Sequence, residues 1–572
     1  MRQTLDFLLF DWLHIDQQCS QPRFAEHGRD SFAAMLDAAE RIARETCAPA
    51  DRACDAEEPR LDAAGRVQLP ASTAAAYAAY RDSGLLAATQ DAEWGGLQLP
   101  CAVAMAANAF FSKASVGVVG YAMLSTGNAN LILAHGTQRQ AEVFARPTLA
   151  GRWFGTMCLS EPAVGSSLGD LTTRAQPDGP DFAVDPLGPR YTLRGSKMWI
   201  SGADHEMGEN IVHLVLAKAS GAQALSLFIV PKFRVRADGS LSGERNDVVL
   251  AGLNHKLGWR GTVNGLLNFG ENGACVGYRV GEEGQGLACM FHMMNEARIG
   301  VGLGATMLAT AGFETSLAYA KDRRQGRAVG VREGAMVPLT EHADVRRMLL
   351  AQKAIAEGAL ALCLYCARLV DEDNAEAREL LALLTPIAKS WPSQWGLESN
   401  SLAIQVLGGA GYTRDWPLEQ HWRDQRLNMI HEGTHGIQAL DLLLRKASRP
   451  QALMLLAARV NTTVERALQR PELAAQANQL AAALALVGRA TQAAWASGEP
   501  AHAALQATPY LQAFGHLVIA WIWLDLGLHS DDPGRAAARD YFFAYELPLV
   551  AAWLTPVLAG ERLLANVNPE AL

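Results

Sequence analysis

The sequence predicts an α+β protein in which a small β-domain lies between helical domains. Three observations support this fold class. The chain has 572 residues, more than one hydrophobic core usually accommodates, so several domains are expected. Its composition is 49% hydrophobic and 19% charged, with many Ala and Leu, which favours an ordered protein rich in helices. Short segments with strand-like composition gather between residues 156 and 280.

The first region, residues 1–155, is expected to be an N-terminal helical domain. Apolar residues recur at intervals of three and four in the segments 30–46, 71–84 and 102–111. The next region, residues 156–280, is expected to form an antiparallel β-barrel or sandwich, because Gly, Asp and Pro turns bound its strand-like segments. These segments are 191–193, 197–201, 211–216 and 225–230.

Two further helical regions complete the chain. The helical period returns at Gly286 and continues to Arg445, with a loop over 325–338, so residues 281–449 are expected to form a helical bundle. Pro450 begins an Ala- and Leu-rich region, residues 450–572, which is expected to be an additional all-α domain. Breaks between its helices are expected at Pro471, 498–500, 533–534 and Pro548.

The charge of the chain disfavours partners that are polyanions. The net charge is −9, and the block 451–572 contains seven Arg, no Lys and ten Asp or Glu. A surface that binds phosphate backbones should be basic, so we expect no nucleic-acid partner. Local basic sites for an anionic cofactor remain possible, since such a site needs only a few Arg.

The nine cysteines are scattered and odd in number, which indicates a reducing compartment and no disulfide framework. Cys363 and Cys366 form a CxxC motif inside an apolar helical segment, with no second Cys or His pair at zinc spacing. We therefore expect them to pack in the core, and we expect no metal site.

No targeting segment is visible in the sequence. The first twelve residues are amphipathic and interrupted by Asp, unlike a secretory signal. The apolar stretch 517–524 is too short to span a bilayer. A cytoplasmic location without membrane insertion is therefore the expectation.

One stretch near the end of the helical bundle carries the most specific pattern of the chain. A carboxylate, Glu432, is followed directly by Gly433 and Thr434, and a Gly-Gly pair lies upstream. Each piece alone is weak. In this order and spacing they resemble the C-terminal signature of acyl-CoA dehydrogenases, and the added block resembles the larger subgroup that includes 3-methylmercaptopropionyl-CoA dehydrogenases. The upstream pieces are 405–412, Pro417, 423–424, Arg426 and Ile430.

The chemistry of that family requires a base, donors for a thioester oxygen and an electron acceptor. Desaturation next to a thioester removes a weakly acidic α-proton and a β-hydride, and a flavin is the usual hydride acceptor. The resemblance makes Glu432 the base and FAD the cofactor. In an apolar cleft we expect the pKa of Glu432 to rise towards neutrality. The alternative base position of the family corresponds to Ala297 here, with Glu296 adjacent but turned by about 100° on a helix.

Two earlier motifs resemble the parts of the family that contact the cofactor and substrate. In the motif 159–167, the resemblance assigns Ser160 to the flavin and Ser166 to the CoA side, although Ser167 replaces the usual Asp. In the motif 197–201, it assigns Trp199 to the flat face of the isoalloxazine and Ser201 to its reactive edge. An indole is well suited to shield a flavin. Packing of Trp199 in a β-core is the alternative.

Other residues are assigned by the resemblance to the FAD of a neighbouring subunit, which implies a dimer. Arg323 would bind the pyrophosphate, with Gln325 nearby, and the alternative for this segment, above all for Arg324, is a basic helix end that complements the helix dipole. The other members are Gln405, Gly408 and Gly409, with Thr434 beside them.

Two residues near the substrate have open roles. Arg298 corresponds to an Arg on the wall of the CoA channel, and a salt bridge to Glu296 or Asp322 is an equal possibility. His431 replaces the usual Tyr before the base. It could alter the depth of the pocket or the pKa of the base, or be a tolerated neighbour.

The sequence thus predicts an FAD-dependent enzyme that converts an acyl-CoA to a 2-enoyl-CoA and passes electrons to an electron-transferring flavoprotein. An acyl-CoA oxidase, which returns electrons to oxygen, is the alternative. A DNA-binding relative with vestigial flavin chemistry is disfavoured by the acidic C-terminal block. The sequence leaves open the acyl chain, the choice between dimer and tetramer, and the role of residues 450–572.

Overall fold

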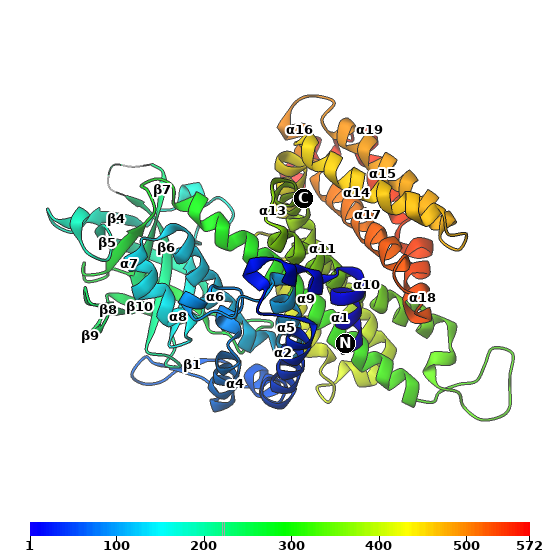
Figure 1. Cartoon of the computed structure of the whole chain (residues 1–572), viewed down its shortest axis with the longest axis horizontal. Coiled ribbons are helices and arrows are strands. Elements are labelled where there is room, and N and C mark those ends of the chain that lie inside the picture. Colours follow the sequence, from blue (N-terminus) through cyan, green and yellow to red (C-terminus); the bar gives the residue numbers. More distant parts are fainter. Residues whose placement is uncertain (220, 222, 572) are drawn as a thin grey trace. The chain divides into compact units, whose positions relative to one another are not determined.

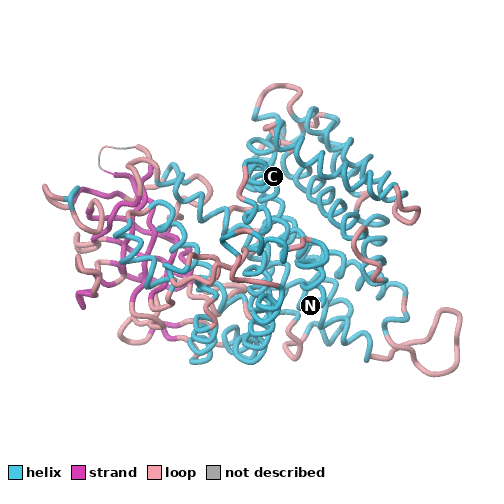
Figure 2. The backbone as a smooth tube through the Cα atoms, in the orientation of Figure 1, coloured by secondary structure: helices cyan, strands magenta, loops and turns pink. Residues whose placement is uncertain are grey.

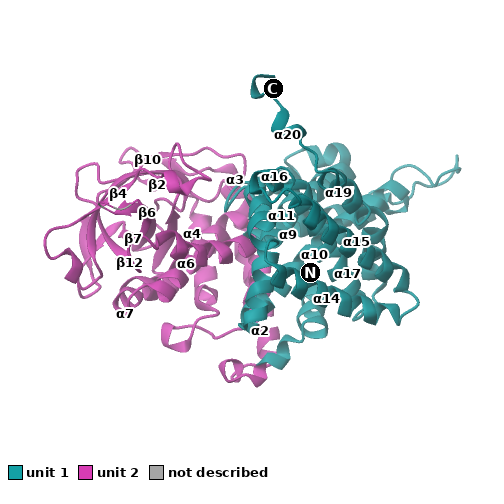
Figure 3. Ribbon diagram, turned by 90° about the horizontal axis from the view of Figure 1, so that it is seen from above, with its two compact units in different colours: residues 1–18, 301–572 teal, residues 19–300 magenta. Residues whose placement is uncertain are grey.

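The computed structural model describes residues 1–219, 221 and 223–571. The chain divides into two compact units, drawn in different colours in Figure 3. Unit 1 comprises Met1–Gln18 and Val301–Leu572, and unit 2 comprises Cys19–Gly300. The first 18 residues therefore belong to the same unit as the helical bundle, whereas the sequence groups them with the N-terminal helices.

Unit 2 begins with helices whose positions follow the predicted apolar periodicity. The predicted helix over 30–46 is α2 with a wider helical turn, Ala43–Cys47, after it. Helix α6 was not predicted, because most of its faces are apolar and its sequence shows no periodic stripe. The helices of unit 2 are α2 (Arg29–Ile42), α3 (Ala48–Ala56), α4 (Ala71–Asp82), α5 (Cys101–Ala114), α6 (Val116–His135), α7 (Gln138–Gln140) and α8 (Arg146–Leu149).

The strands of unit 2 form a central sheet, seen as the magenta tube in Figure 2. Its strand order is β10-β11-β5-β12-β7-β6-β3, and β4 pairs with both β5 and β6. The two predicted segments 191–193 and 197–201 are parts of one long strand, β5. The strands of the sheet are β3 (Trp153–Cys158), β4 (Arg174–Pro177), β5 (Arg190–Ser201), β6 (Asn210–Ala219), β7 (Leu225–Pro231), β10 (Val248–Leu253), β11 (Asn264–Phe269) and β12 (Val276–Val280).

The sheet is mostly antiparallel, as predicted, but β3 and β4 both run parallel to β6. The predicted antiparallel pairing is therefore correct for most strands and wrong for these two pairs. Strand composition reveals which segments are strands, but the direction of a partner depends on the connections between them. Two short two-stranded pairs complete the β-structure: β1 (Arg60–Leu61) with β2 (Val67–Gln68), and β8 (Phe233–Val235) with β9 (Leu241–Arg245).

The core of unit 2 lies between this sheet and α6. Asn128 of α6 is buried, and its Nδ2 donates to the carbonyl oxygens of Thr156 in β3 and Val212 in β6, at 3.0 and 2.9 Å. Gly155 permits this close approach, since a Cβ there would lie 2.4 Å from the Asn128 side chain. The α-helix is thereby fixed against the parallel pair of strands.

In the described residues of unit 1 the elements are helices joined by loops, and the long helix α9 begins in unit 2 and continues into unit 1. Its breaks follow the predicted punctuation: the loop after Asp322 ends before α10, and Pro450, Pro500 and Pro533 each begin a helix. The helices are α1 (Arg2–Asp6), α9 (Gly286–Asp322), α10 (Ala343–Glu372), α11 (Ala375–Leu407), α12 (Leu418–Leu427), α13 (His435–Leu440), α14 (Pro450–Leu468), α15 (Ala474–Ala494), α16 (Pro500–Ala504), α17 (Ala507–Gly527), α18 (Pro533–Tyr541), α19 (Leu549–Ala559) and α20 (Leu563–Asn566).

The C-terminal block packs into the bundle of unit 1. Figure 1 shows α14, α15 and α17 side by side. Trp523 of α17 donates from Nε1 to the carbonyl oxygen of Ala354 in α10, at 3.1 Å, and both residues are buried. Residues after Pro450 therefore complete the core of the bundle.

Two smaller expectations concern cysteines and membranes. All nine cysteines are free thiols, and Cys363 and Cys366 are buried in α10, as predicted. Three helices are long and apolar enough to cross a membrane by length and composition: Val116–His135, Ala343–Glu372 and Pro533–Ala559. In the first two, 72% and 83% of the apolar window is buried inside the protein, against 33% in the third. The expected absence of membrane insertion stays a prediction.

Candidate active site

In unit 2, the two predicted flavin-contacting motifs lie side by side. The backbone N–H of Met198 in β5 donates to the carbonyl oxygen of Ser160, at 3.0 Å. Trp199 follows with a positive φ of 66° and is 61% exposed. A left-handed backbone is unusual for a Trp, and an exposed indole on a strand offers a flat apolar surface to a ligand. Packing of Trp199 in the β-core, the alternative reading of the sequence, is thereby excluded.

A buried ion pair holds these two motifs together. The Nζ of Lys197 lies 3.1 Å from an oxygen of Glu161 and donates to the carbonyl oxygen of Leu159 at 3.0 Å. Burial alone would raise the pKa of Glu161, but hydrogen bonds from Thr172 and Thr173 lower it to about 2. Glu161 is therefore charged at neutral pH, and Lys197 binds the chain on both sides of Ser160.

The other predicted site residues of unit 2 have few contacts with the two flavin-contacting motifs or with one another. The hydroxyl of Ser201, at the end of β5, accepts a hydrogen bond from Asn264 at 3.1 Å. Ser166 is exposed in the loop before Leu168. Arg298 is buried on α9, and its guanidinium donates to Asn295 at 3.4 Å. Glu296 accepts two hydrogen bonds from Asn130, at 2.8 and 3.0 Å. The roles assigned to Ser166 and Arg298 stay predictions.

In unit 1, Glu432 occupies a strained turn between α12 and α13. Its φ is +53° and that of Gly433 is +88°, so two successive residues are left-handed. Such a conformation costs free energy for a residue with a side chain and persists only where the surroundings hold it. Gln438, fully buried on α13, donates from Nε2 to the carbonyl oxygen of Glu432 at 3.0 Å. The Nζ of Lys389 in α11 donates to the carbonyl oxygen of Gly433 at 2.8 Å.

The residues that flank this turn are neutral histidines and a helix cap. Burial, and then the charge of Lys389, lower the pKa of His431 to about 3 and that of His435 to about 4. The Nε2 of His431 lies 3.2 Å from Oδ1 of Asn428. A titrating ring at position 431, one of the two possibilities left by the sequence, is therefore not expected near neutral pH. Thr434 caps α13 by accepting from the N–H of Ile437 at 3.4 Å.

The residues predicted to bind the flavin of a neighbour gather at another part of unit 1, except Thr434, which lies in the Glu432 turn and not beside Gln405. The ends of α9 and α11 share a hydrophobic cluster that includes Ala320, Met348 and Leu407. Arg323 and Gln325 follow α9 and are exposed, and the carbonyl oxygen of Gln325 lies 2.7 Å from the ring of His342. The exposed residues Gln405, Gly408 and Gly409 end α11, and added Cβ atoms at both glycines would meet open space.

These two groups of unit 1 are far apart. Lys389, which contacts the Glu432 turn, and Gln405 are both on α11, about 24 Å apart at 1.5 Å per residue. One end of a bound cofactor cannot contact both.

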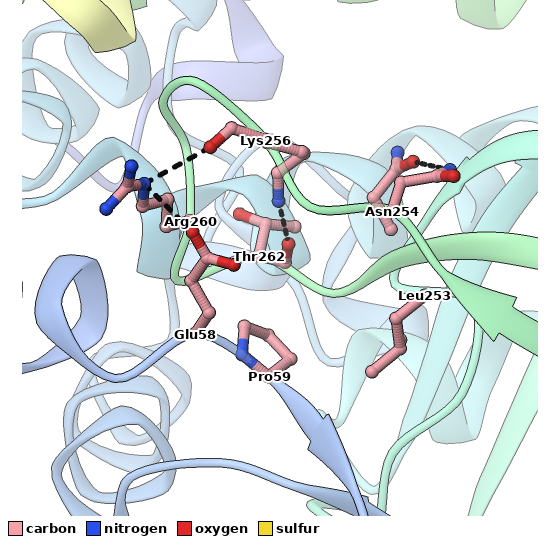
Figure 4. Close-up of a pocket in the computed structure, with 8 residues that line it drawn as sticks. Glu58, Pro59, Leu253, Asn254, Lys256, Arg260 and Thr262 are labelled. Carbon is pink, nitrogen blue, oxygen red and sulfur yellow. Dashed lines mark hydrogen bonds and ion pairs between the residues drawn. The ribbon is translucent and has the colours of Figure 1, made fainter.

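A pocket elsewhere in unit 2 is too small to bind an organic ligand, and its charged side chains already pair with one another or with the backbone (Figure 4). It encloses about 210 Å³, open solvent included, whereas pockets for organic ligands usually exceed about 300 Å³. Arg260 pairs with Glu58 at 3.1 Å, and Lys256 donates to the carbonyl oxygen of Thr262. Among the described residues no group of three or more His, Cys, Asp or Glu could hold a metal ion.

Comparisons with known proteins decide the family. Residues 30–152 match the family model "Acyl-CoA dehydrogenase, N-terminal domain", and residues 284–446 match "Acyl-CoA dehydrogenase, C-terminal domain". The 3-methylmercaptopropionyl-CoA dehydrogenase of Ruegeria pomeroyi is 34% identical over 89% of this chain and 86% of its own length. The chain belongs to the acyl-CoA dehydrogenase family. It is therefore an FAD-dependent oxidoreductase, as the sequence predicts.

Membership of the family also accounts for the C-terminal block. Residues 456–568 match the model "Acetyl-CoA dehydrogenase C-terminal like". A second relative, the broad-specificity linear acyl-CoA dehydrogenase FadE5 of Mycobacterium tuberculosis, is 31% identical over 96% of this chain and 95% of its own. The fold of the whole chain matches an acyl-CoA dehydrogenase from Bacillus anthracis complexed with FAD, with a TM-score of 0.76 and 18% identity over 96% of this chain and 90% of that one.

The residues present fit an FAD. The exposed indole of Trp199 offers a stacking surface, and the open backbone at Gly408 and Gly409 leaves room for close approach of a ligand. The exposed guanidinium of Arg323 suits a phosphate. When bound, the flavin supplies the acceptor for a hydride.

Sequence reasoning missed the residues that support these groups. Glu161 and Lys197 stood inside the two recognised motifs without a role, and Gln438 lies outside them. Lys389 carried one weak signal, since it is a lone cation in an apolar helical segment between Pro386 and Pro392.

Proposed function

We propose that this enzyme removes the α-proton of an acyl-CoA thioester with Glu432 and forms a 2-enoyl-CoA. The observation that carries this proposal is the turn at Glu432. A base must be aimed at a carbon acid, and the left-handed Glu432–Gly433 pair is held by two buried donors, Lys389 and Gln438. His431 and His435, on either side of the turn, are neutral at pH 7. Glu432 is the carboxylic acid of this turn.

The β-hydrogen leaves as hydride in the same overall reaction, so the two electrons of the C–H bond pass to the flavin. The family resemblance adds that the main-chain N–H of Glu432 binds the thioester oxygen, which would stabilise the enolate-like transition state. Trp199 would cover the flavin face and exclude water. Ser160 and Ser201 would bind the ring system from the adjoining segments.

The substrates of similar enzymes, rather than the geometry of the site, limit the range of acyl chains that we propose. The relatives described above are a 3-methylmercaptopropionyl-CoA dehydrogenase and a broad-specificity linear acyl-CoA dehydrogenase. We propose a linear acyl group, including one with a thioether, as the substrate class. A panel of straight, branched, thioether and aryl-alkanoyl CoAs, each tested for bleaching of the flavin, ranks them.

The electron acceptor and the assembly complete the proposal. The acceptor would be an electron-transferring flavoprotein, and the subunits would pair so that Arg323 and Gln405 of one reach the flavin of the other. The resemblance of residues 323–325 and 405–409 to the family is what supports this sharing. Anaerobic reduction by substrate, followed by the rate of reoxidation in air, separates a dehydrogenase from an oxidase. Rapid reoxidation by oxygen would favour the oxidase.

The decisive variant is Glu432→Gln. It should keep FAD and bind acyl-CoA, but its rate of flavin bleaching should fall by at least about 10³-fold, because an amide cannot accept the proton. Glu296→Gln is the matched control, since that carboxylate is held by Asn130, and it should retain most of the activity. Full activity of Glu432→Gln would place the base elsewhere, with Glu296 as the next candidate.

A further inference from the structure

We infer that Lys389 is a positioning residue for the base: its ammonium group holds the turn that presents Glu432. This inference rests on the proposed function of Glu432. It starts from the fact that Lys389 has no solvent exposure, although it is a charged residue in the middle of α11. A buried ammonium group costs several kcal/mol unless strong acceptors surround it. The acceptors that surround the ammonium group of Lys389 must therefore offset the cost of its burial.

The contact at 2.8 Å from Nζ to the carbonyl oxygen of Gly433 acts on the peptide bond between Gly433 and Thr434, the second one after Glu432. Gln438 donates to the carbonyl oxygen of Glu432 at 3.0 Å, and its Nε2 lies 3.5 Å from that of Gly433. The two carbonyl groups of the left-handed pair are thus fixed by side chains from two different helices, α11 and α13. Hydrogen bonds to a charged donor are about twice as strong as neutral ones, so Lys389 contributes the larger share.

The fit around the turn leaves little room for another arrangement. A Cβ added at Gly433 would lie 2.6 Å from Nε2 of Gln438. The turn is closed at its far side by the N–H of His435, which donates to the carbonyl oxygen of Met429 at 3.0 Å. Burial, and then the charge of Lys389, lower the pKa of both His431 and His435, which lie on either side of Glu432. Loss of Lys389 would remove the hydrogen bond from α11 to the carbonyl oxygen of Gly433.

The test compares Lys389→Met, which removes donor and charge, with Lys389→Arg, which keeps both, in the full-length flavoprotein. A 3-thia-acyl-CoA serves as probe, because it has an acidic α-proton but no β-hydrogen, so its deprotonation is read from long-wavelength absorption beside oxidised flavin. Lys389→Met should lose about 10- to 100-fold in the rate of this deprotonation, while FAD content and the Kd of the probe change by less than about threefold. Lys389→Arg should restore at least part of the rate.

A second readout follows the turn itself. Amide hydrogen exchange of a peptide covering 428–438 should speed up in Lys389→Met and return towards the wild-type rate in Lys389→Arg. The matched control is Lys353→Met, which removes a half-buried lysine of α10 paired with Glu357, and it should change neither readout.

The outcomes separate the two proposals. A wild-type enzyme that no acyl-CoA bleaches would overturn the proposed function. A wild-type enzyme that is bleached, beside a Lys389→Met variant that deprotonates the probe at the same rate, would overturn only the role of Lys389. If Lys389→Met does not fold, Lys389→Gln carries the same expectation. Failure of both to fold, with a fully active Lys389→Arg, would assign Lys389 to folding alone and also overturn the inference.

Discussion

Two buried lysines perform the same task at the residue scale, one in each unit. Lys197 binds the main-chain oxygen of Leu159 next to Ser160, and Lys389 binds that of Gly433 next to Glu432. Burial of an ammonium group costs free energy unless hydrogen bonds to strong acceptors offset it, and both lysines donate to a main-chain carbonyl oxygen. Each lysine therefore fixes a backbone segment whose neighbour is predicted to contact the flavin or the substrate.

A first residue-scale prediction concerns the Glu161–Lys197 pair. Glu161→Gln leaves a buried lysine without its counter-charge, so we expect a loss of about 3 kcal/mol of unfolding free energy and weaker retention of FAD. The pKa of Glu161 is lowered to about 2 from 4.5, so its stabilising effect is complete above pH 4.5 and is lost as the pH falls through 2. The difference in stability between wild type and variant should therefore shrink below pH 4.5, as measured by chemical denaturation.

Glu209→Gln is the control for that prediction. Glu209 pairs with Arg152 at 2.7 Å in the same unit, but both side chains are about half exposed. An exposed pair contributes at most about 1 kcal/mol, so this variant should lose much less unfolding free energy than Glu161→Gln at neutral pH. Equal losses in the two variants would show that burial does not set the value of the Glu161 pair.

The residue scale also shows the limit of the sequence. Glu432, Ser160 and Trp199 could be named because their neighbours in the chain form recognisable motifs. Lys389 and Gln438 could not, since they reach the Glu432 turn from other helices and no local pattern links them to it. The left-handed backbone of Trp199 and Glu432 could not be predicted either, because Gly is the residue whose presence in a sequence indicates a positive φ.

At the element scale, α17 joins the first residues of the chain to the C-terminal helices. Asp525 accepts a hydrogen bond from Nε1 of Trp12 at 2.7 Å and another from the hydroxyl of Thr463 at 2.9 Å. That hydroxyl in turn accepts from Nε1 of Trp521 at 3.0 Å. The segment Phe7–Trp12, α14 and α17 thus share one polar network inside unit 1.

A prediction follows for this network. Asp525→Ala leaves the donors of Trp12 and Thr463 without their acceptor in a mostly buried place, so unfolding free energy should fall by about 2–4 kcal/mol. The exposed Asp531→Ala should change it by less than about 0.5 kcal/mol. Thermal unfolding followed by tryptophan fluorescence compares the two. A small effect of Asp525→Ala would mean that the first residues of the chain do not depend on this contact.

Elements with a clear period or a proline boundary could be predicted, and elements without them could not. Helices α14, α16 and α18 begin at prolines that the sequence marks, and α4 begins at Ala71 as its period indicates. Helix α6 has no polar face, and β3 begins at Trp153, two residues before the expected domain border. Both lie in the core of unit 2, where burial on all sides removes the pattern that periodicity needs.

At the scale of the whole molecule, the C-terminal block belongs to the bundle. Gly515 of α17 packs against Trp391 of α11, whose Nε1 donates to the ring of His516 at 3.1 Å. Gly358 of α10 packs against Trp523. The change of composition at Pro450 marks where a helix begins, but composition cannot say which core that helix joins. The contacts between small residues and large aromatic rings on different helices show which core the helix joins, and these contacts can be read only from the structure.

The last prediction tests this shared core with two glycine substitutions. Gly→Ala in a helix interior normally stabilises by about 0.5–1 kcal/mol, and Gly488→Ala on the exposed face of α15 should do so. At Gly358 the new Cβ would lie 2.8 Å from Nε1 of Trp523 and 3.0 Å from the side chain of Ile519, so overpacking should outweigh the gain. Gly358→Ala should therefore destabilise by about 1–2 kcal/mol in chemical denaturation. Circular dichroism and tryptophan fluorescence should report one common transition for unit 1, because α10 and α17 unfold together. Stabilisation of both variants alike would show that the block 450–572 does not press against the bundle and folds on its own.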